Sequence, residues 1–256
     1  MIKIMKINDL HEENVFKPIP GNTPVKVPDT TLAPYKNVGL LIMVYPNSTE
    51  EFIGTATLIG KNDGDEESLY LLTCAHNLYS KNEGGKAKSI KFIRASNVPK
   101  LPFEVVEAEA WYYPAGYPAV SIPNDLPLRF IDDKLIEEDV NLDYGIVKLK
   151  KAIKPGGTLP VLQVKTDEHL LNKSLQINGY GWFNETMSEA NGKLTEVNAL
   201  SLRYPISTAK GASGSALVLK DTTEIIGIHT RETDKAVNQG VRITQVVKDE
   251  LLGWMV

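Results

Sequence analysis

The feature that most constrains the fold of this chain is a recurring pattern of short hydrophobic runs. Each run is rich in β-branched and aromatic residues and is bounded by polar residues, glycine or proline. Short strands separated by turns are typical of a β-barrel or sandwich, and they argue against alternating βαβ units. The runs that predict strands are Val38–Tyr45, Phe52–Ile59, Leu69–Cys74, Ile90–Arg94, Phe103–Tyr112, Tyr144–Leu149, Ser174–Tyr180, Leu200–Tyr204, Ser215–Leu219, Ile225–His229 and Val241–Thr244.

Length and composition narrow the class of protein. The chain has 256 residues, 42% of them hydrophobic, so it can bury a large core. Its formal net charge is −4 and it has no dense cluster of Lys and Arg, which argues against a nucleic-acid-binding surface. No stretch reaches the roughly 18 consecutive apolar residues that a transmembrane helix needs, so we expect no membrane insertion.

The chain divides into an arm, a strand-rich region and a terminal helix. Residues 1–36 contain several prolines and little periodicity, so we expect an extended arm, which is a candidate pro-segment. Residues 37–256 form the predicted globular domain, and any boundary within it falls around Lys151–Thr158, which contains the break Pro155-Gly156-Gly157. Apolar residues at helical spacing predict an amphipathic helix over 245–256.

Cysteine content and the N-terminal residues bear on the compartment. Cys74 is the only cysteine, so the chain forms no internal disulfide and tolerates a reducing environment. A thiol close to His76 in sequence is a candidate reactive group, but we favour a small buried residue, the commoner role of a free cysteine. The first nine residues lack the apolar stretch of about 7–15 residues that marks a secretory signal.

Three polar side chains stand where predicted strands begin or end. His76 closes the segment Thr73-Cys74-Ala75-His76, Asp143 precedes the run Tyr144–Leu149, and Ser213 lies in a glycine-rich turn. A hydroxyl nucleophile, an imidazole base and a carboxylate that orients the imidazole are the groups needed for amide hydrolysis through an acyl-enzyme. We therefore expect these three side chains to meet.

The turn around Ser213 has the sequence Gly211-Ala212-Ser213-Gly214-Ser215. Its glycines allow a tight bend that directs the N–H groups of Gly211 and Ser213 into one concavity, as an oxyanion hole requires. Ser215 is an alternative nucleophile, and its presence also breaks the G-x-S-x-G pattern of α/β-hydrolases.

Other polar residues are weaker candidates. His11 and His169 lie in polar segments without a matching partner motif. Glu137, Glu138 and Asp139 compete with Asp143, but they form a charge run typical of a solvated loop. The sequence has no cluster with zinc-ligand spacing and no glycine-rich nucleotide motif, so we expect no metal and no cofactor.

The order His76, Asp143, Ser213 on an all-β pattern is the order of chymotrypsin-type peptidases. The chain resembles chymotrypsin-fold serine peptidases, and most closely their bacterial glutamyl endopeptidase branch. Outside the three catalytic positions, the segments that carry the resemblance are Gly54–Gly60, similar to G-T-(G/A)-x-(L/V)-I, then Asn178–Gly181, Gly227–Thr230 and Gly240–Thr244.

This resemblance implies an all-β fold of two six-stranded antiparallel barrels, an N-barrel over about 37–150 and a C-barrel over about 158–244. The catalytic groups would lie in the cleft between the barrels. His76 would act as general base and acid, Asp143 would orient it, and Ser213 would be the nucleophile, with Gly211 and Ser213 forming the oxyanion hole. The substrate would be a protein or peptide. The resemblance suggests secretion, while intracellular location and other export routes stay open; a monomer is favoured.

Substrate specificity is also implied by the resemblance. In the glutamyl branch a histidine and a threonine line the S1 pocket, and the matching positions are His229 and Thr208. Both side chains are able to hydrogen-bond an acidic P1 residue, and a protonated His229 would add charge. The sequence departs from the family at Thr230-Arg231-Glu232, and two opposite outcomes stay open there: Arg231 would favour acids, or Glu232 would repel them.

Two other functions are weighed against an active endopeptidase. One is a binding module that keeps the peptidase fold without catalysis, and the other is an esterase-like hydrolase on the same fold. Binding modules of this kind usually lose a catalytic residue, whereas all three candidates are present in this chain.

Overall fold

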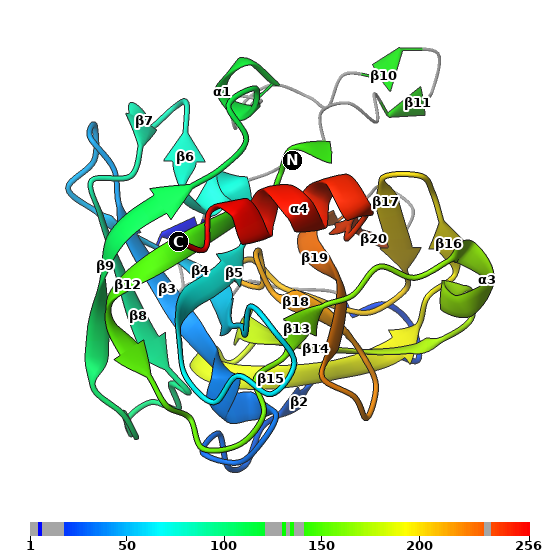
Figure 1. Ribbon diagram of the computed structural model, residues 1–256, viewed down its shortest axis with the longest axis horizontal. Coiled ribbons are helices and arrows are strands. Elements are labelled where there is room, and N and C mark those ends of the chain that lie inside the picture. Colours follow the sequence, from blue (N-terminus) through cyan, green and yellow to red (C-terminus); the bar gives the residue numbers. More distant parts are fainter. Residues whose placement is uncertain (1–4, 7–17, 121–129, 132–133, 136–140, 233–236) are drawn as a thin grey trace.

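The computed structural model describes residues 5–6, 18–120, 130–131, 134–135, 141–232 and 237–256. Two β-sheets form most of the molecule, and a C-terminal helix packs against them (Figure 1). Within the described ranges, no helix combines the length and hydropathy of a membrane-spanning segment.

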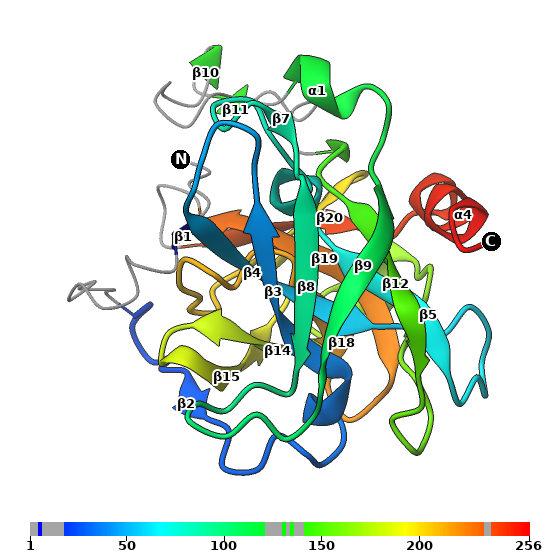
Figure 2. The same ribbon diagram turned by 90° about the vertical axis from the view of Figure 1, so that its left-hand side faces the viewer.

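The first sheet contains a closed barrel. Its strands follow the order β1-β4-β3-β8-β9-β12-β5, and β4 also pairs with β5 (Figure 2). That last pairing joins six antiparallel strands into a ring. The strands are β1 (Met5–Lys6), β3 (Val38–Val44), β4 (Glu51–Leu58), β5 (Ser68–Thr73), β8 (Ser89–Arg94), β9 (Val105–Tyr112) and β12 (Gly145–Ile153).

The second sheet has nine strands in the order β16-β17-β20-β19-β18-β14-β15-β2, with β13 beside β19. Side chains from five of its strands share one core cluster, which includes Leu175, Ala190, Leu202, Leu217 and Ile226. The strands are β2 (Val25–Lys26), β13 (Val161–Leu162), β14 (Ser174–Gly181), β15 (Asn184–Lys193), β16 (Glu196–Val197), β17 (Ser201–Tyr204), β18 (Ala216–Leu219), β19 (Glu224–Glu232) and β20 (Asn238–Arg242).

The second sheet is not shown to close. A six-stranded C-barrel would need a ladder between β15 and β17, and the described residues contain none. The fold is therefore all-β with one closed six-stranded barrel, and the second barrel stays a prediction.

Every run that the sequence predicts as a strand overlaps a strand of the structure. One long strand, β15, was missed because its sequence, NETMSEANGK, is largely polar. It forms because β14 and β2 both supply backbone hydrogen-bonding partners, which a sequence pattern does not reveal.

Residues 18–27 of the predicted arm pack on the second sheet, whereas Met5 and Lys6 pair with β4 of the first sheet. Val25 and Lys26 pair with β15, and Val27 is buried. The backbone N–H of Ile19 donates to Ser207 Oγ at 2.8 Å. Residues 18–27 therefore belong to the packed structure.

Short elements complete the fold. Helix α4 (Gln245–Gly253) begins after Thr244, whose hydroxyl accepts from Val247 N at 3.3 Å. This confirms the predicted C-terminal helix, which ends at Gly253. The remaining elements are β6 (Tyr79–Ser80), β7 (Gly85–Lys86), β10 (Phe130–Ile131), β11 (Lys134–Leu135), α1 (Tyr117–Val120), α3 (Asp167–Leu170) and the 3-10 turns η2 (Tyr35–Asn37) and η3 (Ala75–Asn77).

Candidate active site

His76 and Asp143 are brought together by the pairing of β5 with β12. Gly145 of β12 lies opposite Thr73 of β5, so the residues just beyond each strand end are neighbours. His76 Nδ1 lies 2.8 Å from Asp143 Oδ2, and the backbone N–H of His76 donates to Asp143 Oδ1 at 2.9 Å. Both side chains are buried.

The Asp143 carboxyl is stabilised in its ionised form. Burial alone would raise its pKa, but the charge of His76, two hydrogen bonds from His76 and the charge of Arg231 together hold that pKa below its usual value. The carboxylate therefore stays negative near neutral pH, where it can orient the imidazole and stabilise an imidazolium.

Ser213 belongs to the second sheet's turn before β18, yet it is anchored to the first barrel. Its carbonyl accepts from Thr55 N and from Asn77 Nδ2, each at 2.9 Å. Thr55 Oγ1 also donates to the carbonyl of Gly211 at 2.8 Å. Because Asn77 directly follows His76, these bonds hold the Ser213 turn against the segment that carries the imidazole.

Thr55 and Asn77 were not predicted from the sequence. Both contacts join residues that are far apart along the chain, and neither residue belongs to a catalytic motif. The sequence signal that could have pointed to these two residues is their position: Asn77 directly follows His76, and Thr55 lies in the segment Gly54–Gly60.

The turn around Ser213 leaves two N–H groups available. Gly211 has φ +103°, a left-handed conformation that favours glycine. The N–H groups of Ala212 and Gly214 donate to the carbonyls of Ala209 and His229. In the described part of the chain, the N–H groups of Gly211 and Ser213 have no such partner, which leaves them free to bind an oxyanion.

Cys74 contacts the other side of the imidazole. Its Sγ lies 3.4 Å from His76 Nε2, whereas no hydrogen bond joins His76 to Ser213 Oγ in the described structure. Burial, together with the nearby Asp143 charge, raises the pKa of the Cys74 thiol well above its usual value. The thiol is therefore neutral and fully buried, in agreement with the predicted role.

Ser215 differs from Ser213 in exposure. The Ser215 side chain is fully buried, and its Oγ has no partner among the described residues. Ser213 is half-buried. A substrate therefore has better access to Ser213.

Cys74, His76 and Asp143 are also the one group of metal-ligand side chains that gathers within the described ranges, with ligand atoms within 4.8 Å of one another. The carboxylate already accepts two hydrogen bonds from His76, and the thiol is protonated. These properties suit a proton-transfer pair better than a metal centre, which needs a thiolate.

His229 lies at the strand position that the sequence predicts for the S1 pocket. It is buried, and its Nδ1 lies 2.8 Å from the hydroxyl of Tyr204. Burial, and to a lesser degree the charge of His76, lower the pKa of His229 to about 3. The imidazole of His229 is therefore neutral near pH 7, because burial without a paired carboxylate disfavours the cation.

Thr208 is half-buried, and its Oγ1 accepts from Asn238 Nδ2 at 2.8 Å. No hydrogen bond joins Thr208 to His229 among the residues described. They are linked indirectly. Asn238, which bonds Thr208, pairs with Tyr204 across β20 and β17, and the Tyr204 hydroxyl bonds His229.

The segment that departs from the family pattern forms the end of β19. Arg231 is 4% exposed, and its charge lowers the pKa of Asp143. Glu232 is exposed and pairs with Asn238 of β20. Arg231 therefore acts on the His76–Asp143 pair from within the protein.

The weaker candidates stay apart from this site. His169 is exposed in α3, where its backbone N–H donates to the hydroxyl of the N-cap residue Thr166. His11, Glu137, Glu138 and Asp139 lie outside the described residues.

Comparison with known sequences identifies relatives. Glutamyl endopeptidase of Staphylococcus aureus (strain MRSA252) is 26% identical over 235 residues, which cover 91% of this chain and 57% of that protein. Glutamyl endopeptidase of Staphylococcus epidermidis is 28% identical over 147 residues, or 53% of this chain and 50% of that protein. The chain thus spans about half the length of the curated relatives it matches.

Solved structures share the fold. A Glu endopeptidase in complex with MPD matches with a TM-score of 0.69 and 20% identity, covering 92% of this chain and 97% of its own. HL collagenase matches with a TM-score of 0.64 and 14% identity, over 91% and 98% of the two chains. Human heparin binding protein matches with a TM-score of 0.61 and 9% identity, over 90% and 94%.

The family itself is identified by a sequence model. Residues 54–228 match the model described as a trypsin-like peptidase domain. That stretch covers more than half of the chain and contains His76, Asp143 and Ser213. The chain therefore belongs to the family of trypsin-like peptidase domains.

Proposed function

We propose that this chain is a serine endopeptidase that cleaves peptide bonds through an acyl-enzyme. The observation that carries the proposal is the buried His76–Asp143 pair, with a 2.8 Å bond, beside a turn that presents Ser213 and two unpartnered N–H groups. Each of these groups has a required part in acyl transfer.

In the first half of the reaction, Ser213 Oγ attacks the carbonyl carbon of the scissile peptide and gives its proton to His76 Nε2. The negative oxygen of the tetrahedral intermediate accepts hydrogen bonds from the N–H groups of Gly211 and Ser213. His76 then protonates the leaving amine, and the C–N bond breaks.

In the second half, water attacks the ester that links the acyl group to Ser213. His76 takes a proton from that water and returns it to Ser213 Oγ as the ester bond breaks. Asp143 stays ionised throughout and stabilises the imidazolium. The donors that hold the Ser213 carbonyl, Thr55 and Asn77, keep the nucleophile beside the base.

A fluorophosphonate probe tests the nucleophile. We expect labelling of Ser213, located by mass spectrometry, and loss of both labelling and peptide cleavage in Ser213→Ala and His76→Ala. Ser215→Ala is the matched control, because its hydroxyl is buried and has no partner in the described structure. Labelling that persists in Ser213→Ala but disappears in Ser215→Ala would reassign the nucleophile.

Two other functions remain to be distinguished. The likeness to a protein named for heparin binding makes a non-catalytic binding module a real alternative, because a shared fold does not establish function. Folded protein that neither reacts with the probe nor cleaves peptides would support a binding module. Turnover of esters without peptides would support an esterase.

We further propose that the enzyme prefers Glu or Asp at P1, with Thr208 and His229 contacting the acid. Two relatives named glutamyl endopeptidase support this specificity. A neutral His229 whose Nδ1 accepts a hydrogen bond from the Tyr204 hydroxyl would carry its hydrogen on Nε2. That N–H would donate a hydrogen bond to the substrate carboxylate. Recognition would then rest on hydrogen bonds.

A peptide library that varies P1 tests this preference. We expect Glu and Asp to lead, and Tyr204→Phe to raise KM for Glu substrates several-fold with little change in kcat, because Tyr204 only positions His229. A profile led by basic or aromatic P1 residues would exclude acidic specificity.

We also propose a domain arrangement. Residues 37–256 would form the peptidase domain with an N-barrel over about 37–150, a C-barrel over about 158–244 and a terminal helix over 245–256. Within the arm of residues 1–36, any removable pro-segment would precede residue 18, because residues 19–27 contact Ser207 and β15.

A further inference from the structure

The peptide unit that follows Ser213 is held from both sheets. Its carbonyl accepts from Thr55 N and from Asn77 Nδ2, each at 2.9 Å. Its N–H, which belongs to Gly214, donates to the carbonyl of His229 at 2.9 Å. Because both polar ends of this peptide are bonded, its orientation is fixed, and that orientation sets the direction in which the Ser213 side chain leaves the backbone.

Thr73 of β5 connects Asn77 to β4. Its Oγ1 donates to the carbonyl of Thr55 at 2.8 Å and accepts from Asn77 Nδ2 at 3.0 Å. Thr55, Thr73 and Asn77 are each 0% exposed. These groups therefore form one buried chain of hydrogen bonds, which runs from the Thr55 carbonyl through Thr73 and Asn77 to the Ser213 carbonyl.

Each bond in this chain has only one possible direction. The Thr55 carbonyl can only accept, so the Thr73 hydroxyl donates to it and uses a lone pair to accept from Asn77. The end of the Asn77 amide that faces Thr73 is then the NH2 group, and its second hydrogen goes to the Ser213 carbonyl. Asn77 Oδ1 makes no hydrogen bond among the residues described, so no bond on that side competes for the orientation of the amide.

Two glycines leave just enough room for the Asn77 amide. A Cβ on Gly54 would lie 2.4 Å from Asn77 Nδ2, and a Cβ on Gly214 would lie 2.9 Å from it. Both distances are well below ordinary van der Waals contact. The amide is thus enclosed by β4 on one side and by the Ser213 turn on the other, so a shift of the amide must shift the turn.

We propose that Thr73 and Asn77 are positioning residues for the nucleophile. The Thr73 hydroxyl orients the Asn77 amide, and the amide holds the peptide unit that carries Ser213 in the geometry of attack. Neither side chain touches the substrate or takes up a proton. This role rests on the proposed peptidase function, and its loss slows the chemical step without weakening substrate binding, because only the nucleophile is misplaced.

Two variants of Thr73 test the first link. Thr73→Val removes the hydroxyl and nearly keeps the shape, and we expect kcat and the rate of fluorophosphonate labelling to fall by roughly tenfold while KM stays within about twofold of the parent value. Thr73→Ser keeps the hydroxyl, so all three quantities should stay within about threefold of the parent values. A folded Thr73→Val with the kcat of the parent would overturn the proposal, and so would a Thr73→Ser as slow as Thr73→Val.

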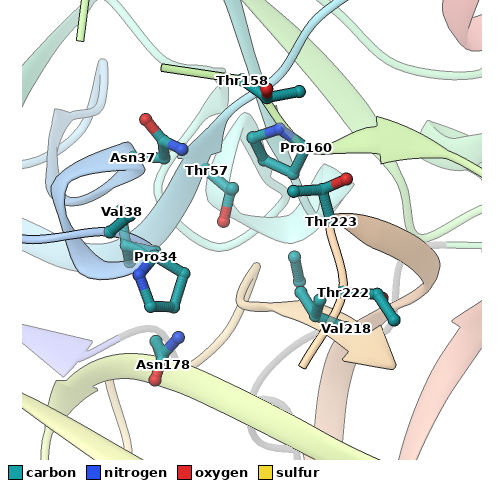
Figure 3. A pocket seen from close by; sticks show the side chains of 12 residues that line it. Pro34, Asn37, Val38, Thr57, Thr158, Pro160, Asn178, Val218, Thr222 and Thr223 are labelled. Atoms are coloured by element: carbon teal, nitrogen blue, oxygen red, sulfur yellow. The ribbon is translucent and has the colours of Figure 1, made fainter. Parts of the chain in front are cut away.

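Thr57→Val is the matched control on β4. Thr57 is 2% exposed, and its hydroxyl has no partner within the described ranges, so the substitution breaks no hydrogen bond. Thr57 lines a pocket between the two sheets together with Asn178 and Val218, and no member of the hydrogen-bonded chain lines that pocket (Figure 3). We expect kcat and KM within about twofold of the parent values. An equal loss of kcat in Thr57→Val and Thr73→Val would attribute the effect to general packing and overturn the proposal.

Gly54→Ala tests the second link without removing any polar group. The three atoms nearest to the added Cβ all belong to the Asn77 side chain, so this variant displaces the amide. We expect a roughly tenfold lower kcat in Gly54→Ala and a similar loss in Asn77→Ala. The double variant should lose no more than Asn77→Ala, because the clash disappears with the amide. Additive losses would mean that Gly54 acts independently of Asn77, which contradicts the proposal.

Hydrogen exchange separates this proposal from the proposed peptidase function. Both Nδ2 hydrogens of Asn77 are bonded and buried, so NMR of the parent protein should show them protected from exchange, and Thr73→Val should reduce that protection by at least about tenfold. A folded parent that neither cleaves peptides nor reacts with the probe would refute the peptidase function, while protected Asn77 hydrogens would still support the chain of bonds. Rapid exchange of those hydrogens in the parent would overturn the positioning role, whatever the activity.

Discussion

At the scale of single residues, Cys74 contacts the proposed base on the side of Nε2. Its pKa is raised by burial, so the thiol is neutral and lies 3.4 Å from His76 Nε2. We expect Cys74→Ala to keep peptide turnover within about threefold of the parent, because a buried neutral thiol takes no part in acyl transfer. Steady-state kinetics checks this, and a loss of several orders of magnitude would make Cys74 the nucleophile.

His229 makes stability depend on pH. Its pKa is about 3 in the folded protein and about 6.5 when unfolded. Between these values the unfolded chain binds a proton that the folded chain does not, so this residue lowers stability by about 1.4 kcal/mol for each pH unit below 6.5. We expect His229→Gln to lose less stability than the parent between pH 7 and pH 5, by about 2 kcal/mol.

Urea unfolding at the two pH values measures this difference. The lowered pKa of Asp143 does not interfere, because stability linked to it is lost only as pH falls below about 4. Parallel stability profiles for the parent and His229→Gln would show that His229 titrates normally in the folded protein.

At the scale of elements, the Ser213 turn fits against β4 and β5 only because residue 214 is glycine. A Cβ on Gly214 would lie 2.2 Å from Thr73 Oγ1 and 2.3 Å from the carbonyl oxygen of Thr55, and φ is +90°. We expect Gly214→Ala to reduce kcat/KM by about 100-fold, because displacement of the turn misplaces the nucleophile.

Gly64→Ala is the matched control for that variant. Gly64 has φ +87°, but a Cβ there would have no atom within 4 Å. It therefore carries the same backbone strain without the clash, and we expect activity within about threefold of the parent. Equal losses in both variants would attribute the effect to backbone strain.

The arm is a second element with a testable role. Ser207, next to Thr208, donates its N–H to Asn22 Oδ1 at 2.8 Å, and Ile19 N donates to Ser207 Oγ at 2.8 Å. We expect a chain lacking residues 1–28 to show a several-fold higher KM for Glu substrates, because these bonds support the segment that carries Thr208. Deletion of residues 1–17 is the control: it removes β1 but keeps these bonds to Ser207, so KM should stay near the parent value. Higher activity after the longer deletion would instead indicate a larger pro-segment.

At the scale of the whole molecule, α4 connects the end of the second sheet to the first barrel. Trp254 stacks with Tyr112 and Tyr144, whose ring centroids lie 6.4 and 6.1 Å away. Lys61 Nζ also donates to the carbonyl of Met255 at 2.6 Å. The helix therefore links the two halves of the chain close to Asp143.

Removing the buried side of this helix should destabilise the whole fold. Leu251 is 0% exposed, and we expect Leu251→Ala to lower the free energy of unfolding by about 2–5 kcal/mol. Val246 is 75% exposed on the same helix, and Val246→Ala should change it by less than about 0.5 kcal/mol. Denaturant titration followed by tryptophan fluorescence measures both; a small effect of Leu251→Ala would mean that α4 detaches before the barrel unfolds.

The predictions from sequence succeeded where the signal is local. Runs of β-branched and aromatic residues between turns predicted eleven strands of the two sheets, and apolar spacing predicted α4. His76 and Asp143 were predicted together, and the structure places them within hydrogen-bonding distance.

Other features depended on partners far away in the chain. Strand β15 is polar and forms through pairing with β14 and β2. The low pKa of His229 results from burial, and the anchoring of Ser213 results from Thr55 and Asn77. No local pattern encodes burial or a contact across more than a hundred residues.

The sequence by itself therefore determined where strands and turns lie and which residue types are available for chemistry, because hydrophobic period and turn chemistry act over a few residues. Only the tertiary structure decided which backbones pair, which side chains lose water and which polar groups remain without a partner. Those outcomes depend on the packing of one sheet against the other, since solvation and hydrogen bonding are set by neighbours in space.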